Sequence, residues 1–209
     1  MIASGISNAV IKRLPRYYRY LKDLSNNHVE RISSQELSVL MNTTPSQVRQ
    51  DFNMFGGFGQ QGYGYNVQNL CYEIGNIIGV NQSSSMIIIG AGNLGQALMN
   101  YVNFPKFGYD IQAMFDINPR LIGLMIRGIE IQSIDDLEPF LSEHHVQIAA
   151  LTLPRTQAPE MAQRLVDAGI KAIWNFAPVD LNLPGDVVVE NIHLTESLMQ
   201  LSFRCNNLT

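Results

Sequence analysis

The sequence predicts an α/β protein with a small helical amino-terminal unit, a larger unit built on a parallel sheet, and a final helix. Three observations support this: two short capped helices before residue 55, a strand–glycine–helix sequence from residue 86, and alternating strand and helix signals up to residue 191. We place the units at 1–80, 85–191 and 192–209, with the polar segment NQSSS (81–85) as the boundary between the first two.

Composition and charge exclude several classes of protein. The 209 residues are 46% apolar but contain no run of 18 apolar residues, so we expect no membrane partner. No secretory signal is evident, and we expect a cytoplasmic protein. Two distant cysteines and four histidines without ligand spacing predict no metal site. The net charge is +3 over residues 1–60 and −7 over residues 61–209, which favours a polyanion partner for the amino-terminal unit, although a solvated helical face would look the same.

Helical signals fill the amino-terminal unit. Apolar residues at three- and four-residue steps predict a helix over 6–24, interrupted at Pro15, where a new helix can begin. The pair Ser33-x-x-Glu36 forms a capping box for a second helix, and Thr44-x-x-Gln47 repeats the signal eleven residues later. Two capped helices joined by about four residues are typical of a helix-turn-helix.

The helix that begins at Pro45 has an apolar and a polar side. Val48, Phe52 and Phe55 form the apolar stripe. The other side carries residue types that hydrogen-bond base edges or phosphates, namely Ser46, Gln47, Arg49, Gln50 and Asn53. An arginine suits guanine and a glutamine suits adenine, but an ordinary polar surface would carry the same residues, so this helix alone leaves both interpretations open.

The segment FGGFGQQGYGYNV (55–67) follows directly. Tyr63, Tyr65 and Val67 alternate as in a strand, and Gln60-Gln61-Gly62 can form a turn. Flexible linkers are not rich in aromatic residues, which makes a linker the weaker interpretation. We therefore expect a β-hairpin over 56–67, which is the wing of a winged helix-turn-helix domain.

A dinucleotide-binding fingerprint opens the larger unit. The apolar strand 86–89 runs into Gly90-x-Gly92-x-x-Gly95 and then into a helix that ends near Tyr101. A second strand ends at Asp116, where such sites place a partner for the ribose hydroxyls. A carboxylate there repels a 2′-phosphate, so NAD(H) is expected rather than NADP(H). A glycine-rich turn that binds nothing is the alternative.

Strand and helix signals alternate through the rest of this Rossmann-like unit. Strands are expected at 129–133 (an edge strand), 146–154, 170–178 and 187–191, with a helix at 157–168. Ligands in such sheets lie at the carboxyl ends of strands. The candidates there are Thr152, Pro154, Asn175, Phe176, Ala177 and Pro178.

The last helix, over 195–205, is apolar on most of its surface, which favours burial against a second copy of the chain. We expect a dimerisation helix that is exchanged in a homodimer.

Two other classes of function remain open from the residues alone. An NAD-dependent oxidoreductase needs a substrate domain and an acid or base near the nicotinamide, and the chain has no room for the first and only His193 for the second. We therefore expect no enzyme and no catalytic residue. A protein-interaction module with a structural nucleotide is the other alternative, and the basic first helix argues against it.

The whole chain resembles the redox-sensing transcriptional repressor Rex family. The resemblance rests on PSQVRQDF, FGxxGQQGYGYNV, IIIGAGNLGQAL, ALTLPR and WNFAPVDL, in this order over residues 6–205. It implies a cytoplasmic homodimer in which a winged helix binds palindromic double-stranded operator DNA and a Rossmann domain binds NADH and NAD+ as effector ligands. Members of this family leave DNA when NADH binds.

The resemblance also implies roles for particular residues. Operator contacts are expected from the 45–54 helix, with Arg49 as the chief contact, and from the wing residues Gly59, Gln60, Gln61, Gly62 and Tyr63. Arg13 and Arg16 of the basic first helix complete the expected DNA-binding set. Pyrophosphate contacts are expected at Gly90, Ala91, Gly92, Asn93, Leu94 and Gly95, a ribose contact at Asp116, and nicotinamide-side contacts at 152–154 and 175–178. Tyr101 and the last helix match the region that reports the state of the nicotinamide.

This sequence departs from the family pattern at a few positions. Many members carry a basic residue where Gln50 stands and another where Gln60 or Gln61 stands, so fewer phosphate contacts and weaker DNA binding are expected here. His193 stands where an acid is common.

Overall fold

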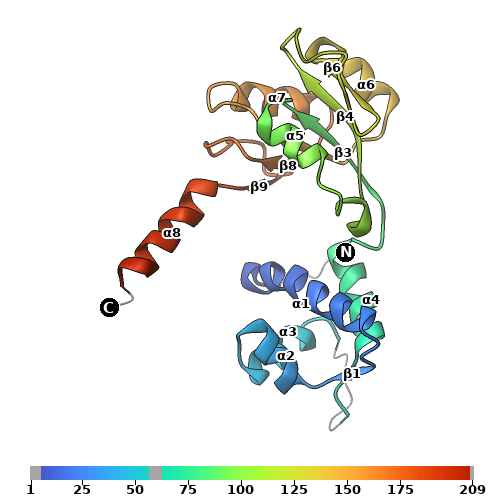
Figure 1. Ribbon diagram of the computed structural model, residues 1–209, viewed down its shortest axis with the longest axis vertical. Helices are drawn as coiled ribbons and strands as arrows, with labels where there is room; N and C mark the ends of the chain where they lie inside the picture. Colours follow the sequence, from blue (N-terminus) through green and yellow to red (C-terminus); the bar gives the residue numbers. More distant parts are fainter. Residues whose placement is uncertain (1–5, 57–62, 208–209) are drawn as a thin grey trace. The chain divides into compact units, whose positions relative to one another are not determined.

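The computed structural model of the protein describes residues 6–56 and 63–207. The chain divides into two compact units, Met1–Gln82 and Ser83–Thr209 (Figure 1).

The first unit contains four helices and one short two-stranded sheet among its described residues: α1 (Asn8–Asn26), β1 (Arg31–Ile32), α2 (Ser34–Met41), α3 (Pro45–Asn53), β2 (Tyr65–Asn66) and α4 (Val67–Ile78). Apolar residues of all four helices are buried together. The aromatic rings of Tyr17 and Phe52 lie 4.9 Å apart, and those of Phe52 and Tyr65 lie 5.1 Å apart. This aromatic contact joins α1, α3 and β2, and so holds α3 against the rest of the unit.

Three predictions in this unit need correction. The helix over α1 continues through Pro15 without interruption, because neighbouring helices bury its apolar stripe and compensate for the lost hydrogen bond. The capping box at Ser33 is confirmed, but at Thr44 only half of one forms, since Gln47 donates to Asp51 instead. Val67, expected in the wing, begins α4.

The wing also pairs differently from a simple hairpin. Tyr65–Asn66 pairs antiparallel with Arg31–Ile32, which lies before α2 in the sequence. Residues 57–62, which hold the expected turn, lie outside the described residues. Strand pairing between such distant segments depends on the packing of the helices between them, which local sequence patterns do not reveal.

The second unit is a seven-stranded sheet with the order β5-β6-β4-β3-β7-β8-β9. Its strands are β3 (Ser84–Ile89), β4 (Tyr109–Asp116), β5 (Met125–Ile126), β6 (Ile129–Ser133), β7 (Ile148–Leu151), β8 (Ala172–Asn175) and β9 (Val188–Asn191). All pairs are parallel except β5 with β6. The strand at 129–133 was expected at an edge, but the short β5 pairs with its outer side. The order reverses between β3 and β7, which makes that point the switch point of the sheet.

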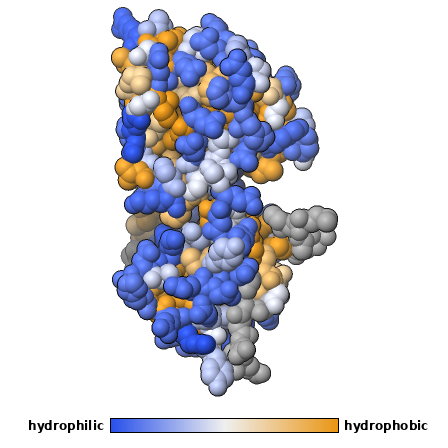
Figure 2. All heavy atoms as spheres, turned by 90° about the vertical axis from the view of Figure 1, so that its right-hand side faces the viewer, coloured by the Kyte–Doolittle hydropathy of each residue, from blue (hydrophilic) through white to orange (hydrophobic). Residues whose placement is uncertain are grey.

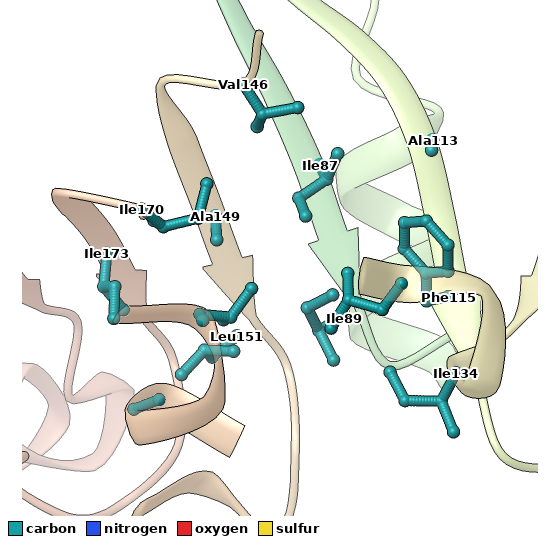
Figure 3. Close-up of a cluster of buried hydrophobic side chains, with 13 residues drawn as sticks. Ile87, Ile89, Ala113, Phe115, Ile134, Val146, Ala149, Leu151, Ile170 and Ile173 are labelled. Carbon is teal, nitrogen blue, oxygen red and sulfur yellow. The ribbon is translucent and has the colours of Figure 1, made fainter. Parts of the chain in front are cut away.

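Helices cover both faces of this sheet. Side chains that alternate along β3 belong to two separate cores. Ile87 and Ile89 lie in the core on the side of α6 (Leu137–Glu143) and α7 (Ala158–Asp167). Figure 3 shows both in this core, together with side chains of the neighbouring strands such as Phe115 and Leu151. Met86 and Ile88 lie in the core on the side of α5 (Asn93–Met99). A strand buried on both faces reads as a continuous apolar run, which is why residues 86–89 were recognisable in the sequence.

The last helix, α8 (Leu194–Asn206), buries none of its residues. Its large apolar side chains are more than half exposed, and they are Leu194, Leu198, Met199, Leu201 and Phe203. Such a surface is unusual for a helix of a soluble unit.

Candidate functional site

The glycine fingerprint forms a tight turn between β3 and α5. Gly90 has a φ of +101°, and a Cβ atom there would lie 2.8 Å from the carbonyl oxygen of Thr152. A Cβ atom on Gly95 would collide with the carbonyl oxygen of Gly90. The Thr152 hydroxyl fixes the turn from the neighbouring strand by donating to the Gly90 carbonyl at 2.8 Å. The turn therefore needs Gly90 and Gly95 for its own geometry.

Asp116 ends β4 beside this turn. Its carboxylate accepts hydrogen bonds from the backbone N–H of Ala91 at 2.5 Å and of Asn118 at 2.7 Å. These bonds fix both the glycine turn and the loop that follows β4. The acidic residue is thus placed as a dinucleotide site requires, at the carboxyl end of the strand next to the fingerprint.

A cleft of about 700 Å³ opens at the switch point of the sheet. Five of the predicted nucleotide-binding residues line it: Gly90, Gly92, Asp116, Thr152 and Pro154. Sequence reasoning missed other apolar residues of the same cleft, including Ile117 and Ile134. Each follows the carboxyl end of a strand, so the rule that ligands lie at strand ends could have found them.

The 175–178 segment lies at the carboxyl end of β8, as expected, and its role in nicotinamide binding stays a prediction. Asn175 is fully buried, and its amide donates to the Val179 carbonyl and to Asn191 Oδ1, each at 2.8 Å. Its side-chain Oδ1 accepts from the backbone N–H of Ala177 at 3.0 Å. The Asn175 side chain therefore clamps the loop after β8 to the end of β9. None of the residues 175–178 lines the cleft at the switch point.

Tyr101 is also separate from that cleft. It lines a second, mostly apolar hollow of about 430 Å³ together with Phe104 and Trp174. The rings of Tyr101 and Phe104 are 4.8 Å apart, and those of Phe104 and Trp174 are 5.8 Å apart. A role for Tyr101 in nucleotide sensing remains a prediction.

The polar face of α3 is exposed at Ser46, Arg49, Gln50 and Asn53. The guanidinium of Arg49 donates to Ser34 Oγ at 2.9 Å and to Ser46 Oγ at 3.3 Å. Both partners are hydroxyl groups at the surface, so Arg49 can exchange them for other acceptors.

The face of the molecule in Figure 2 is predominantly hydrophilic, with apolar residues scattered among polar ones.

Two other predicted DNA-binding residues have an internal partner. Arg13 forms a bidentate ion pair with the buried Asp51, and Gln47 donates to the same carboxylate. Burial raises the pKa of Asp51, but hydrogen bonds from Arg13, Gln47 and Tyr17 outweigh this, and the pKa lies below its usual value. The donor groups of Arg13 and Gln47 thus point inward in this structure.

The remaining predicted DNA-binding residues lie on the first helix and the wing. Arg16 is exposed, and its guanidinium lies 5.8 Å from the ring centre of Tyr20. The carbonyl of Tyr63 accepts a hydrogen bond from Arg31 at 3.1 Å, so Arg31, which sequence reasoning missed, anchors the described end of the wing. Gly59, Gln60, Gln61 and Gly62 lie outside the described residues.

The described ranges 6–56 and 63–207 contain neither a cluster of metal ligands nor a membrane-spanning helix. No group of three His, Cys, Asp or Glu side chains there could hold a metal ion. No helix in those ranges is long and apolar enough to cross a membrane.

Comparison with known proteins assigns both units. Residues 5–53 match the family model described as "Putative DNA-binding protein N-terminus", and residues 81–179 match the model of a CoA binding domain. Over 201 residues, the chain is 54% identical to the redox-sensing transcriptional repressor Rex of Caldanaerobacter subterraneus, covering 96% of this chain and 90% of the relative. The chain belongs to the redox-sensing transcriptional repressor Rex family. The Rex protein of Clostridioides difficile is also 54% identical, over 95% of each chain.

Solved structures of a Rex-family repressor, RSP, share the whole fold. The chain matches RSP in complex with β-NAD+ and operator DNA with a TM-score of 0.93 and 53% identity, covering 98% of this chain and 94% of that one. It matches RSP in complex with β-NADH with a TM-score of 0.90 and 50% identity, covering 98% and 96%. The predicted fold class and family are confirmed. The relatives are named as transcriptional repressors, which agrees with the prediction that the chain is not an enzyme.

Proposed function

We propose that this Rex-family chain is a cytoplasmic transcriptional repressor that binds palindromic operator DNA as a homodimer and leaves it when NADH binds. The observation that carries the proposal is the match over 98% of the chain to a repressor bound to both β-NAD+ and operator DNA. The described residues supply what each ligand needs: an exposed polar helix for DNA and a cleft at the switch point for the dinucleotide.

The α3 helix is the element that reads the operator. Its exposed polar residues suit direct contacts in the major groove, where Arg49 can pair with a guanine and Gln50 with an adenine. Arg16, on α1, is exposed and suits a phosphate, which positions the domain without reading sequence.

The cleft beside the glycine turn takes the NAD(H) molecule. The pyrophosphate lies against the backbone at Gly92, where no side chain fills the space. The Asp116 carboxylate accepts from the ribose hydroxyls, and its negative charge selects against the 2′-phosphate of NADP(H). Apolar residues such as Ile117 and Ile134 suit the adenine ring.

The redox state of the ligand is read through the charge of its nicotinamide ring. The oxidised ring is a cation and the reduced ring is neutral, so burial in apolar surroundings costs less for NADH. A ligand that moves a two-state repressor from 1:99 to 99:1 must prefer one state by about 5.5 kcal/mol. The same coupling free energy must appear as weaker NADH binding in the presence of operator DNA.

A second copy of the chain covers the exposed apolar face of α8. Five large apolar side chains on one 13-residue helix need burial, and a two-fold symmetric partner also supplies the second half-site contact of a palindrome. Sedimentation of the full chain tests this part directly. A monomer at micromolar concentration would contradict it.

The proposal as a whole is tested by selection from a random duplex-DNA pool in the presence of NADH, of NAD+ or of neither. We expect a palindrome to be enriched with NAD+ or no ligand, and not with NADH. Calorimetric titration of NADH with and without saturating operator then measures the coupling. An NADH affinity that operator leaves unchanged would overturn the release mechanism.

A further inference from the structure

Asp51 is a charged residue without access to solvent in the last turn of α3. Its exposed fraction is 0%, although ionised carboxylates are rarely buried without compensation. Arg13 donates to it from Nε and from Nη2, each at 2.7 Å, the Tyr17 hydroxyl donates at 3.0 Å, and Gln47 Nε2 donates at 2.8 Å. Four hydrogen bonds therefore meet on one carboxylate.

Three of these bonds join α1 to α3, and the fourth, from Gln47, lies within α3. Arg13 and Tyr17 are one turn apart on α1, and Gln47 and Asp51 are one turn apart on α3. The apolar contacts of Val48 and Phe52 hold α3 against the core, but the hydrophobic effect has no preferred direction and tolerates rotation of the helix. The bidentate pair between Arg13 and Asp51 has a defined plane and direction, so it sets the rotation of α3 about its axis.

The same bonds divide the polar residues of α3 into two groups. Gln47 is engaged with Asp51, and the charge of Arg13 is neutralised by it, so neither is free in this structure to contact DNA. The outward-facing residues are Ser46, Arg49, Gln50 and Asn53. A rotation of α3 that turns Arg49 away from a base edge would cost one of the specific contacts on which operator choice depends.

We propose that Asp51 is a positioning residue for operator recognition, which acts by holding Arg13 and Gln47 so that α3 presents Arg49 and Gln50 at a fixed angle to the base edges. This inference rests on the proposed function, in which α3 reads the operator. Asp51 itself touches no DNA in this account. It contributes to specificity rather than to general affinity for duplex DNA.

The first test uses Asp51→Asn in the full chain, which keeps the shape and removes the charge. We expect affinity for the operator to fall roughly 10- to 100-fold, the loss of about one good base contact. Binding to non-specific duplex should not weaken. The affinity for non-specific duplex should depend more steeply on salt concentration, with a slope larger by up to about one phosphate contact, because Arg13 regains an unpaired charge.

The matched control is Asp186→Asn. This residue forms an exposed ion pair with Lys171 in the other unit, at 2.5 Å, so the variant makes the same change in net charge away from α3. We expect it to bind operator like the unsubstituted protein. An equal loss of operator affinity in both variants would overturn the proposal, as would an unchanged ratio of operator to non-specific affinity in Asp51→Asn.

A second variant keeps the test decisive if Asp51→Asn fails to fold. Gln47→Met removes only one donor, and the carboxylate keeps its partners Arg13 and Tyr17. Affinities are then measured for operators substituted at each base pair in turn. We expect discrimination to weaken at several positions together, whereas loss at a single base pair would mean that Gln47 reads that base directly and would refute the positioning role.

The two proposals fail differently. Absence of any operator binding by the unsubstituted protein contradicts the proposed function. Operator binding that is present and is insensitive to the Asp51 and Gln47 substitutions contradicts only the positioning role.

Discussion

The substitution Gly92→Ala tests whether glycine at this position is required for folding or for nucleotide binding. Gly92 has a φ of −68°, which any residue can adopt, and a Cβ atom there would have no heavy atom within 4 Å. The residue nevertheless lines the cleft beside Asp116. Neither the backbone conformation nor the space around this position requires a glycine, and we attribute it to the approach of the pyrophosphate.

The expected size of the effect follows from this geometry. A phosphate oxygen that accepts from a backbone N–H lies about 2.9 Å from the nitrogen, and an added methyl group occupies that approach. Losing one charge-assisted hydrogen bond costs about 1.5–3 kcal/mol, which corresponds to roughly 10- to 150-fold weaker NADH binding. Without ligand, two effects on stability oppose each other. Alanine stabilises the protein by lowering the entropy of the unfolded chain, whereas glycine is preferred over alanine at a helix N-cap. The unfolding midpoint should therefore move by less than about 3 °C.

Three measurements test this prediction. They are the thermal unfolding midpoint without nucleotide, the NADH dissociation constant, and the NADH concentration that releases operator. Gly95→Ala is the contrasting variant, because its Cβ atom collides with backbone and overpacking costs about 1–3 kcal/mol of stability. An NADH affinity of Gly92→Ala within twofold of the unsubstituted protein would refute the assignment of the pyrophosphate to this surface.

Three further predictions concern charged residues. Asp116→Ala should weaken NADH binding about tenfold by fluorescence titration and leave operator binding without nucleotide unchanged, because the carboxylate lies only in the nucleotide unit. Arg49→Ala should weaken operator binding by about 1–3 kcal/mol in a gel-shift titration with unchanged NADH affinity, since its guanidinium is exposed and donates to the hydroxyls of Ser34 and Ser46. The pKa of Asp51 lies below its unfolded value of about 3.9, so the stability that this carboxylate contributes is full above that pH and is lost as pH falls through the folded pKa. Urea unfolding from pH 6 down to the acid limit should show a smaller acid loss for Asp51→Asn than for the unsubstituted protein, and equal losses would contradict the assignment.

Local signals in the sequence determined much of the fold. The capping box at Ser33, the apolar run at 86–89 and the glycine fingerprint after it each depend on residues close together in the chain. Helix starts, buried strands and tight turns are set by neighbouring residues, so these elements lie where the sequence places them. The cleft followed from them, because parallel strands bring their carboxyl ends to one edge of the sheet.

Other features depended on contacts between distant segments. The sequence places Asn175 at a strand end, but it does not reveal that this side chain is buried and bound to Asn191, sixteen residues away. Pro15 reads as a helix break, yet packing holds α1 continuous through it. In each case contacts with distant residues decided the outcome, and at Pro15 they offset a local cost of about 3 kcal/mol for proline inside a helix.

The sequence by itself determined which family this chain belongs to, where α2 and α3 begin, and where the glycine turn lies, because each of these depends on a short contiguous pattern. Only the tertiary structure decided that Arg13 and Gln47 face Asp51 rather than solvent, across 38 residues in the case of Arg13. The physical reason is that a buried carboxylate needs hydrogen-bond donors, and the packing of the helices decides which segment supplies them. Sequence patterns do not reveal which residues 38 positions apart come into contact.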